Sequence, residues 1–181
     1  MKVSVIIPCF NEENTIEKVI NKLLDINNFD KEIIVVDDFS SDQSRHILEN
    51  KISNKIINIL FNDKNLGKGY CIRKGIQSAK GDIILIQDAD LEYDPSDIKK
   101  LINPIINGDA DVVYGSRFKS SEETRVLFFW HSLGNKILTL FSNILTGLNL
   151  TYMEVCYKAF KSKVIKDIIL KENRFGFEPE V

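Results

Sequence analysis

Short apolar runs that alternate with amphipathic segments constrain the fold of this chain more than any other feature. Val3 to Ile7 and Ile33 to Val36 are runs rich in β-branched residues, which is typical of strands buried on both faces of a sheet. Further strands are expected at Ile56 to Phe61, Ile83 to Gln87 and Asp111 to Tyr114. Strands that alternate with helices predict an α/β fold, with a mostly parallel sheet covered by helices on both faces.

Helical patterns fill the intervals between these strands. We predict Asn11 as the N-cap residue of the first helix, and Ser40 as the start of a capping box for the second. Two further helices are expected over Tyr70 to Ala79 and from Asp94 to about Ile106.

Composition narrows the possible functions. The chain has 181 residues, which suits one domain, and its net charge of −2 argues against nucleic acid as a partner. The three cysteines are scattered without C-x-x-C spacing, so we expect free thiols, a reducing compartment and no zinc site. Met1 leads directly into a strand without a signal peptide, which predicts a cytoplasmic location. The abrupt end at Val181 suggests a chain truncated at its C-terminus.

Asp88-Ala89-Asp90 directly follows an apolar strand. Because open α/β sheets bind ligands at the carboxyl ends of their strands, both carboxylates are expected at the binding edge. Hard oxygen ligands suit Mg²⁺ or Mn²⁺, and such a cation can neutralise a diphosphate and make a nucleotide diphosphate a better leaving group. An isolated pair of this kind could equally be a solvated turn.

Three other loops carry polar residues after expected strands. They cover Pro8 to Glu13, Asp37 to Asp42, and Asn62 to Gly69. An acidic residue after the second strand, Asp37 or Asp38, can accept hydrogen bonds from a nucleobase or ribose. The glycines on either side of Lys68 allow the backbone to approach a ligand closely. Lys68 itself can bind a phosphate as a point charge. A lysine that is merely solvated is the alternative. Four such loops at one edge predict a binding site.

The order of these motifs resembles that of the family 2 glycosyltransferases. The motifs are Val5-Ile6-Ile7-Pro8 with Asn11-Glu12, Val35-Val36-Asp37-Asp38 with Ser40 and Asp42, Asn65-Leu66-Gly67-Lys68-Gly69, and Asp88-Ala89-Asp90. Four later segments are similar to the polyprenyl (dolichyl)-phosphate sugar transferase branch: Gly115 to Phe118, Trp130 to Lys136, Met153 to Phe160, and Phe175 to Glu180. The resemblance implies a GT-A type fold in one domain over 1–181, with a nucleotide-sugar-binding half at 1–115 and an acceptor-side half at 116–181.

The resemblance also implies roles for individual residues. The residues expected to bind the nucleotide sugar are Pro8, Asn11, Glu12, Asp37, Asp38, Lys68 and Asp88. Those expected to hold the metal are Asp88, Asp90 and Glu92, although Glu92 could instead be an ordinary acidic residue before a helix. The phosphate of the acceptor is assigned to Arg117, Arg125 and Lys158, and the catalytic residues are Asp88, Asp90 and Arg117.

The implied reaction is inverting transfer of a hexose from a UDP- or GDP-sugar to a polyprenyl phosphate, with Mg²⁺ or Mn²⁺ as cofactor. A polyprenyl phosphate is already an anion, so the enzyme needs only to align it and to stabilise the departing diphosphate. A sugar hydroxyl acceptor, which would require a carboxylate base, is an alternative. The apolar pattern from Arg125 to Leu150 predicts either a helix that covers the sheet or an interfacial helix at a membrane. The expected location is therefore peripheral, at the inner face of the cytoplasmic membrane.

One position departs from the pattern of that branch. Tyr152 stands where relatives usually carry an acidic residue, and a tyrosine cannot act as a carboxylate base at neutral pH. A catalytically impaired, sugar-nucleotide-binding remnant is therefore an alternative function. Two other classes of protein fit less well. A nucleotidyltransferase would have a glycine-rich loop after the first strand, and a phosphoacceptor receiver domain would have its acidic pair after that strand. This chain has Pro8 to Asn11 at that position.

Overall fold

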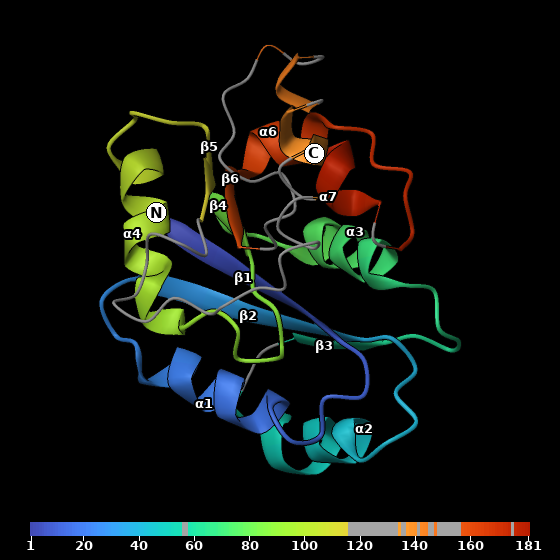
Figure 1. Cartoon of the computed structure of the whole chain (residues 1–181). Coiled ribbons are helices and arrows are strands. Elements are labelled where there is room, and N and C mark those ends of the chain that lie inside the picture. The colour runs from blue at the N-terminus through green and yellow to red at the C-terminus, as the bar shows by residue number, and fades with distance from the viewer. Residues whose placement is uncertain are drawn as a thin grey trace.

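A computed structural model describes residues 1–55, 58–115, 134, 137–140, 142–144, 147, 157–174 and 176–181 (Figure 1). The strands are β1 (Lys2–Cys9), β2 (Asp30–Asp37), β3 (Asn58–Phe61), β4 (Ile83–Ile86), β5 (Val112–Tyr114) and β6 (Lys158–Lys161). The helices are α1 (Ile16–Asp25), α2 (Ser44–Ile47), α3 (Lys68–Ser78), α4 (Ile98–Ile106), α6 (Ser162–Asp167) and α7 (Phe177–Glu180). A π-helical turn over Leu48–Ile52 extends α2, and a 3₁₀ turn over Pro95–Asp97 leads into α4.

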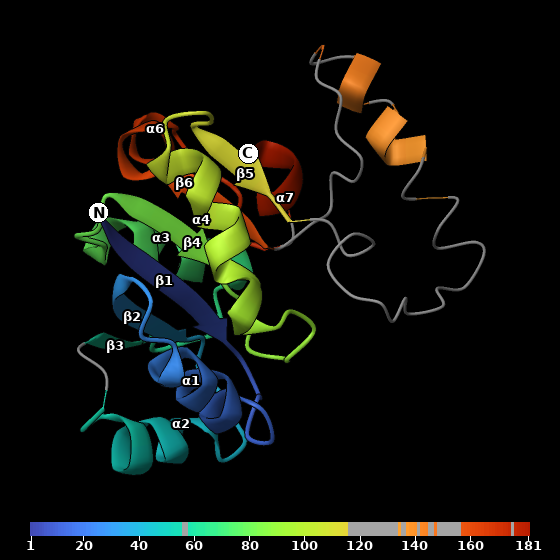
Figure 2. The same cartoon turned by 90° about the vertical axis from the view of Figure 1, so that its left-hand side faces the viewer.

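The described strands form one sheet in the order β3-β2-β1-β4-β6-β5. The first four pair in parallel, whereas β6 pairs antiparallel with both β4 and β5. The predicted mostly parallel sheet is therefore confirmed. The antiparallel strand comes from near the end of the sequence and lies between β4 and β5 (Figure 2). A segment from near the end of the sequence, β6, thus lies inside the sheet next to β4.

Helices cover both faces of the sheet, as the alternation of apolar runs predicted. On one face, Val3, Val5 and Ile7 pack with the apolar sides of α1 and α4. On the other face, Ile6 packs with α3, α6 and α7, including the fully buried Phe177. Successive residues of a strand point to opposite faces, so a run that is apolar throughout supplies both layers of the core.

Several helix starts differ from the predictions. The prediction of Asn11 as a cap is wrong, because α1 begins only at Ile16 and Asn11 has a φ of +56° in the preceding loop. The capping box at Ser40 is also wrong, because α2 begins at Ser44, whose N–H donates to Asp42 at 2.9 Å. The predicted cap at Asp94 is confirmed by a 2.9 Å hydrogen bond from the Ser96 N–H.

Most of the Arg125 to Leu150 segment lies outside the described residues. In the part that the structure describes, Ile137, Leu140 and Ile144 are exposed, so these side chains do not cover the sheet. No described helix is long and apolar enough to cross a bilayer.

Candidate active site

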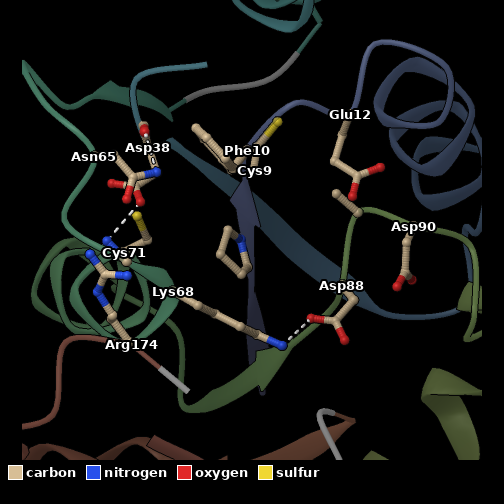
Figure 3. Close-up of a pocket in the computed structure, with 13 residues that line it drawn as sticks. Cys9, Phe10, Glu12, Asp38, Asn65, Lys68, Cys71, Asp88, Asp90 and Arg174 are labelled. Atoms are coloured by element: carbon tan, nitrogen blue, oxygen red, sulfur yellow. Dashed lines mark hydrogen bonds and ion pairs between the residues drawn. The ribbon is translucent and has the colours of Figure 1, made fainter. Parts of the chain in front are cut away.

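A cavity of about 400 Å³ lies at the carboxyl ends of β1 and β4, where the sequence predicted a binding site (Figure 3). Its lining residues are Pro8, Cys9, Phe10, Glu12, Asp38, Asn65, Gly67, Lys68, Cys71, Asp88, Ala89, Asp90 and Arg174. The parallel sheet brings the loops after β1, β2, β3 and β4 to one edge, because the four strands run in one direction. The cavity is therefore built from all four loops that the sequence singled out.

Asp88 and Asp90 form one wall of this cavity. The Asp88 side chain is only 12% exposed, and its Oδ1 lies 2.7 Å from the Lys68 Nζ. Asp90 stays accessible to solvent, and its Oδ1 accepts the Glu92 N–H at 3.0 Å. Desolvation by the surrounding protein raises the pKa of Asp90 above its ordinary value, and the charges of Asp88 and Glu92 add to this rise. A cation placed between the two aspartates would relieve this repulsion.

Lys68 is the first residue of α3 and lies between two carboxylates. Its Nζ contacts Asp88 Oδ1 at 2.7 Å and Glu178 Oε1 at 3.3 Å, and its side chain is 17% exposed. Figure 3 shows the lysine extended across the cavity toward Asp88. The predicted phosphate ligand therefore faces the cavity and is bound by two acidic side chains, one of them from the C-terminal helix α7.

The two acidic residues after β2 have different surroundings. Asp37 is fully buried, does not line the cavity, and has an Oδ1 with no hydrogen-bond partner among the described residues. Asp38 lines the cavity and holds the loop after β3 in place. Its Oδ1 accepts hydrogen bonds from Asn62 Nδ2 at 2.8 Å and the Leu66 N–H at 2.9 Å, and its Oδ2 accepts the Gly67 N–H at 2.7 Å.

The first loop contributes Pro8 and Glu12 to the cavity, whereas Asn11 is not among the lining residues. The Asn11 Oδ1 instead accepts the Ser41 N–H at 2.8 Å, so this side chain joins the loop after β1 to the loop after β2. Desolvation raises the pKa of Glu12, and the nearby charges of Asp90 and Asp88 raise it further. The acidic side of the cavity is thus shared by loops from β1 and β4.

Comparisons with known proteins agree with this geometry. The family model described as Glycosyl transferase family 2 matches residues 4–169. The chain belongs to this family. It is 33% identical over 137 residues to a dolichol-phosphate mannosyltransferase from Pyrococcus furiosus, an alignment that covers 75% of this chain and 39% of the relative. It is 33% identical over 179 residues to a UDP-N-acetylglucosamine–dolichyl-phosphate N-acetylglucosaminyltransferase from Methanococcus voltae, covering 90% of this chain and 70% of the relative.

A solved structure supports the GT-A type fold. Glucosyl-3-phosphoglycerate synthase from Mycobacterium tuberculosis, in complex with Mn²⁺, UDP and glucosyl-3-phosphoglycerate, matches with a TM-score of 0.74 and 20% identity. The match covers 98% of this chain and 62% of that protein. The predicted family and fold class are both confirmed. The chain spans less than two thirds of that synthase and of the Pyrococcus relative.

The residues expected to bind the acceptor are only partly described. Arg117 and Arg125 lie outside the described residues, as does Tyr152. Lys158 lies in β6 and is fully buried. Its Nζ donates to the Glu178 carbonyl oxygen at 3.0 Å and lies 4.4 Å from the centre of the Tyr114 ring. In this structure Lys158 therefore contacts α7 and is not among the residues that line the cavity.

The acidic residues of the cavity are the candidates for a metal site. Among the described residues, no three His, Cys, Asp or Glu side chains are grouped closely enough to hold a metal ion by themselves. Asp88 and Asp90 both line the cavity, but Glu92 does not. Two carboxylates with room beside them suit a cation such as Mg²⁺, which usually takes its remaining ligands from water and substrate phosphates. The donor set therefore fits a divalent cation that is shared with a ligand.

Sequence reasoning missed the contribution of the C-terminal segment. Arg174 lines the cavity and Glu178 binds Lys68. The signal that could have revealed this was the pair Gly67 and Gly69, which was expected to admit a ligand. A Cβ on Gly67 would lie 2.4 Å from the Asn173 carbonyl oxygen, and one on Gly69 would lie 2.5 Å from that of Glu172. The chain's own C-terminal segment thus makes the close approach that these glycines permit.

Cys9 and Cys71 are free and buried, as expected for thiols outside a disulfide framework. Burial raises the pKa of Cys71 to about 12, and the charge of Asp38 adds to the rise. These thiols therefore stay protonated at neutral pH and act as small apolar groups in the cavity wall.

Proposed function

We propose that this family 2 glycosyltransferase is a metal-dependent, inverting hexosyltransferase that transfers a sugar from UDP or GDP to a polyprenyl phosphate. The observation that carries the proposal is the cavity in which Asp88, Asp90 and Lys68 meet at the carboxyl edge of the sheet. The two relatives described above, whose names specify dolichyl-phosphate acceptors, support the choice of acceptor.

The donor binds along the cavity, with its diphosphate near Lys68 and its nucleoside near Asp38. Lys68 supplies a positive charge on a flexible stem that can meet the diphosphate, and its ammonium group forms ion pairs with Asp88 and Glu178. Pro8 and Glu12 line the cavity at the end of β1, where they would shape the donor pocket. In this proposal residues 1–115 bind the donor and residues 116–181 serve the acceptor, except that Arg174 and Glu178 also border the donor cavity.

Asp88 and Asp90 would hold Mg²⁺ or Mn²⁺, with Glu92 as a further candidate ligand. When bound, the cation neutralises charge on the leaving diphosphate. The crystal structure of the synthase described above contains Mn²⁺ and UDP, which supports a metal for this fold. Asp90 is suited to the role because desolvation and neighbouring carboxylates disfavour its ionised form when no cation is present.

The acceptor phosphate attacks the anomeric carbon from the side opposite the leaving group, which inverts its configuration. Because a phosphate monoester is already an anion, the enzyme gains most by holding it in line and needs no strong base. Arg117 and Arg125 would bind that phosphate by bidentate hydrogen bonds, whereas Lys158, the third residue expected there, is fully buried against Glu178. A lipid acceptor also places the protein at a membrane surface, and we propose the inner face of the cytoplasmic membrane.

The first test is calorimetric titration of UDP-glucose and of GDP-mannose, each with and without Mn²⁺. We expect one donor to bind in a Mn²⁺-dependent manner, and Asp88→Asn to weaken that binding. Lys100→Ala is the matched control, because this exposed lysine pairs with Asp97, which is not among the cavity-lining residues. A folded protein that binds neither donor would contradict the proposal. Transfer of the sugar to a short-chain polyprenyl phosphate then tests the acceptor.

Two alternatives give different results in the same experiments. An enzyme that acts on a sugar hydroxyl would bind the donor but leave polyprenyl phosphate unmodified, and it would need a carboxylate such as Glu12 as base. A sugar-nucleotide-binding remnant would bind the donor and transfer it to nothing. Restored turnover in Tyr152→Asp would identify Tyr152 as the cause of that defect.

A further inference from the structure

Two consecutive isoleucines are exposed on the loop that follows α6. Ile168 is 38% exposed and Ile169 is 81% exposed, which is the largest fraction among the large apolar side chains that the structure describes. We call these two residues the apolar tip. In Figure 1 the loop that carries them, drawn in red, ends beside α3. A single exposed isoleucine is ordinary, but two neighbours on one loop form a surface that a partner can cover.

A groove of about 400 Å³ lies beside the apolar tip. It is lined by Arg73, Ile76 and Gln77 of α3 and by residues between 165 and 170, the apolar tip included. The groove lies on the face of the sheet that α3 and α6 cover, and it shares no lining residue with the donor cavity. It is therefore a second concave surface, with apolar walls, that the proposed reaction does not use.

The groove carries positive charge that is not neutralised locally. Its cationic lining residues are Arg73 and Lys166, and neither forms an ion pair with an acidic side chain of the described residues. The Lys166 Nζ donates to the Ala79 carbonyl oxygen at 2.7 Å. The Arg73 guanidinium donates to the Glu172 carbonyl oxygen and to the Asn173 side-chain oxygen. Because all these oxygens belong to neutral groups, both cations keep their full charge toward an anion.

The surroundings of the apolar tip are also basic. Residues 163–172 contain three lysines and two acidic residues, which together with Arg73 gives a local net charge of +2, whereas the whole chain carries −2. No acidic side chain is among the lining residues of the groove. The groove and the apolar tip therefore combine exposed apolar surface with positive charge, on a protein that is otherwise acidic.

Contacts on both sides of the loop hold the apolar tip in place. Leu170 packs against the core cluster that contains Ile76 and Ile165. Further along, the Tyr70 N–H donates to the Asn173 carbonyl oxygen at 3.0 Å. A surface that is held before its partner arrives loses less entropy on binding.

We propose that the apolar tip and the groove dock this protein on an anionic phospholipid bilayer. The two isoleucines enter the boundary between headgroups and acyl chains, while Arg73 and Lys166 meet the lipid phosphates. Apolar and basic side chains on one surface are the combination that binds proteins to anionic membranes. The inference rests on the proposed function for its lipid acceptor and adds the surface that faces the membrane.

The apolar tip lies close in the chain to the donor cavity. Arg174 lines that cavity and follows Ile169 by five residues. Five residues span at most about 18 Å even when fully extended. The phosphate of a membrane-bound acceptor therefore has only a short path from the docked surface to the cavity.

The test is flotation of the full chain with vesicles of phosphatidylcholine alone and of phosphatidylcholine mixed with phosphatidylglycerol. Ile169→Glu places a carboxylate at the apolar tip, and Lys166→Gln removes one charge from the groove. The matched controls are Ile106→Glu and Lys100→Gln, which make the same changes at exposed positions of α4, on the opposite face of the sheet. Urea unfolding checks that each variant folds.

We expect the wild type to float with the mixed vesicles alone and to be released by added salt. Ile169→Glu should weaken vesicle binding by about tenfold or more, because an apolar side chain is lost from the bilayer. Lys166→Gln should weaken it by about fivefold, because one cation near the anionic surface is lost. Both controls should match the wild type.

Transfer assays connect docking to the reaction. Ile169→Glu should still bind the donor and still transfer sugar to a short-chain polyprenyl phosphate in solution, because the apolar tip lies outside the donor cavity. Its transfer to a long-chain acceptor in mixed vesicles should fall in proportion to vesicle binding.

Several results would overturn the docking surface. A wild type that floats with neither vesicle does not dock at all, and an Ile169→Glu protein that floats like the wild type docks through another surface. Equal loss in Ile106→Glu would show a general effect of added negative charge. Release of the wild type by inorganic phosphate at constant ionic strength would show that the groove binds a free anion.

Two further outcomes separate this inference from its alternatives. A wild-type dimer in sedimentation that Ile169→Glu converts to a monomer would show that a second copy of the chain covers the apolar tip, which overturns the inference. A wild type that docks as expected but transfers sugar to no polyprenyl phosphate would contradict the proposed function and leave the docking surface supported.

Discussion

Replacing Gly69 with alanine sets two opposing effects against each other at one position. Alanine favours a helix over glycine by about 1 kcal/mol, so α3 alone would be stabilised. In the folded protein, however, the new Cβ would lie 2.5 Å from the Glu172 carbonyl oxygen and 3.0 Å from that of Arg174. Both are backbone atoms, which cannot rotate away, so residues 172–174 must withdraw from α3.

The withdrawal removes two hydrogen bonds, which the Gly69 and Tyr70 N–H groups donate to the segment. At about 0.5–1.5 kcal/mol each, their loss costs about 1–3 kcal/mol. The loss exceeds the gain in helix propensity over most of this range, so we expect a net destabilisation of about 0–2 kcal/mol. Arg174 would also leave the cavity, so nucleotide affinity should fall together with stability.

Urea unfolding and amide exchange of Tyr70 measure the two effects separately. Gln77→Ala, an exposed position on the same helix, serves as the control for helix propensity. We expect Gly69→Ala to lower the unfolding midpoint and to expose the Tyr70 N–H to fast exchange, whereas Gln77→Ala should do neither. A Gly69→Ala protein that is as stable as the wild type and still protects Tyr70 would refute the packing of residues 172–174 on α3.

Three further predictions follow from single contacts. Lys68→Ala should weaken donor binding by about tenfold or more, because a charge-assisted contact to the diphosphate is lost, and equal affinity in calorimetry would contradict its role. Asp90→Asn should weaken Mn²⁺-dependent donor binding but leave metal-free binding unchanged, as measured by titration with and without chelator. Glu32→Gln should lower the free energy of unfolding by about 1–3 kcal/mol at neutral pH. Hydrogen bonds from Ser4 and the Lys80 N–H outweigh desolvation and hold the pKa of Glu32 below its ordinary value. The stability that Glu32 contributes is therefore present above its unfolded-state pKa and is lost as the pH falls through the folded-state pKa, so the gap between wild type and variant should close in acid.

The sequence was sufficient for the features that local pattern controls. The runs at Val3 to Ile7 and Ile33 to Val36 are apolar on both sides, which specifies a parallel sheet covered by helices whatever lies elsewhere in the chain. Open α/β sheets bind ligands at the carboxyl ends of their strands. Because Asp88 and Asp90 directly follow an expected strand, their sequence position alone predicts that both lie at the binding site.

The features that the sequence did not predict depend on contacts between distant residues. The β6 strand has the sequence Lys158-Ala159-Phe160-Lys161. Because a lysine stands at each end, the sequence lacks the apolar run that would predict a buried strand. The Glu178 carbonyl oxygen and the Tyr114 ring are among the groups that contact the buried ammonium group of Lys158. No periodicity in the sequence indicates such a pairing, because both partners come from other parts of the chain.

Asp37 and Asp38 show the limit of sequence reasoning most directly. Both follow the same strand, and their chemistry is identical, so the sequence alone leaves open which of them binds a ligand. Adjacent residues at a strand end point to opposite sides, and this places Asp38 at the cavity and buries Asp37 completely. Asp38 also holds the loop that carries Lys68, through its hydrogen bonds to the Leu66 and Gly67 N–H groups. A substitution at Asp38 therefore changes the loop and the cavity together, whereas the Arg174 side chain lines the cavity without such bonds to the described residues, so that its replacement changes the cavity alone.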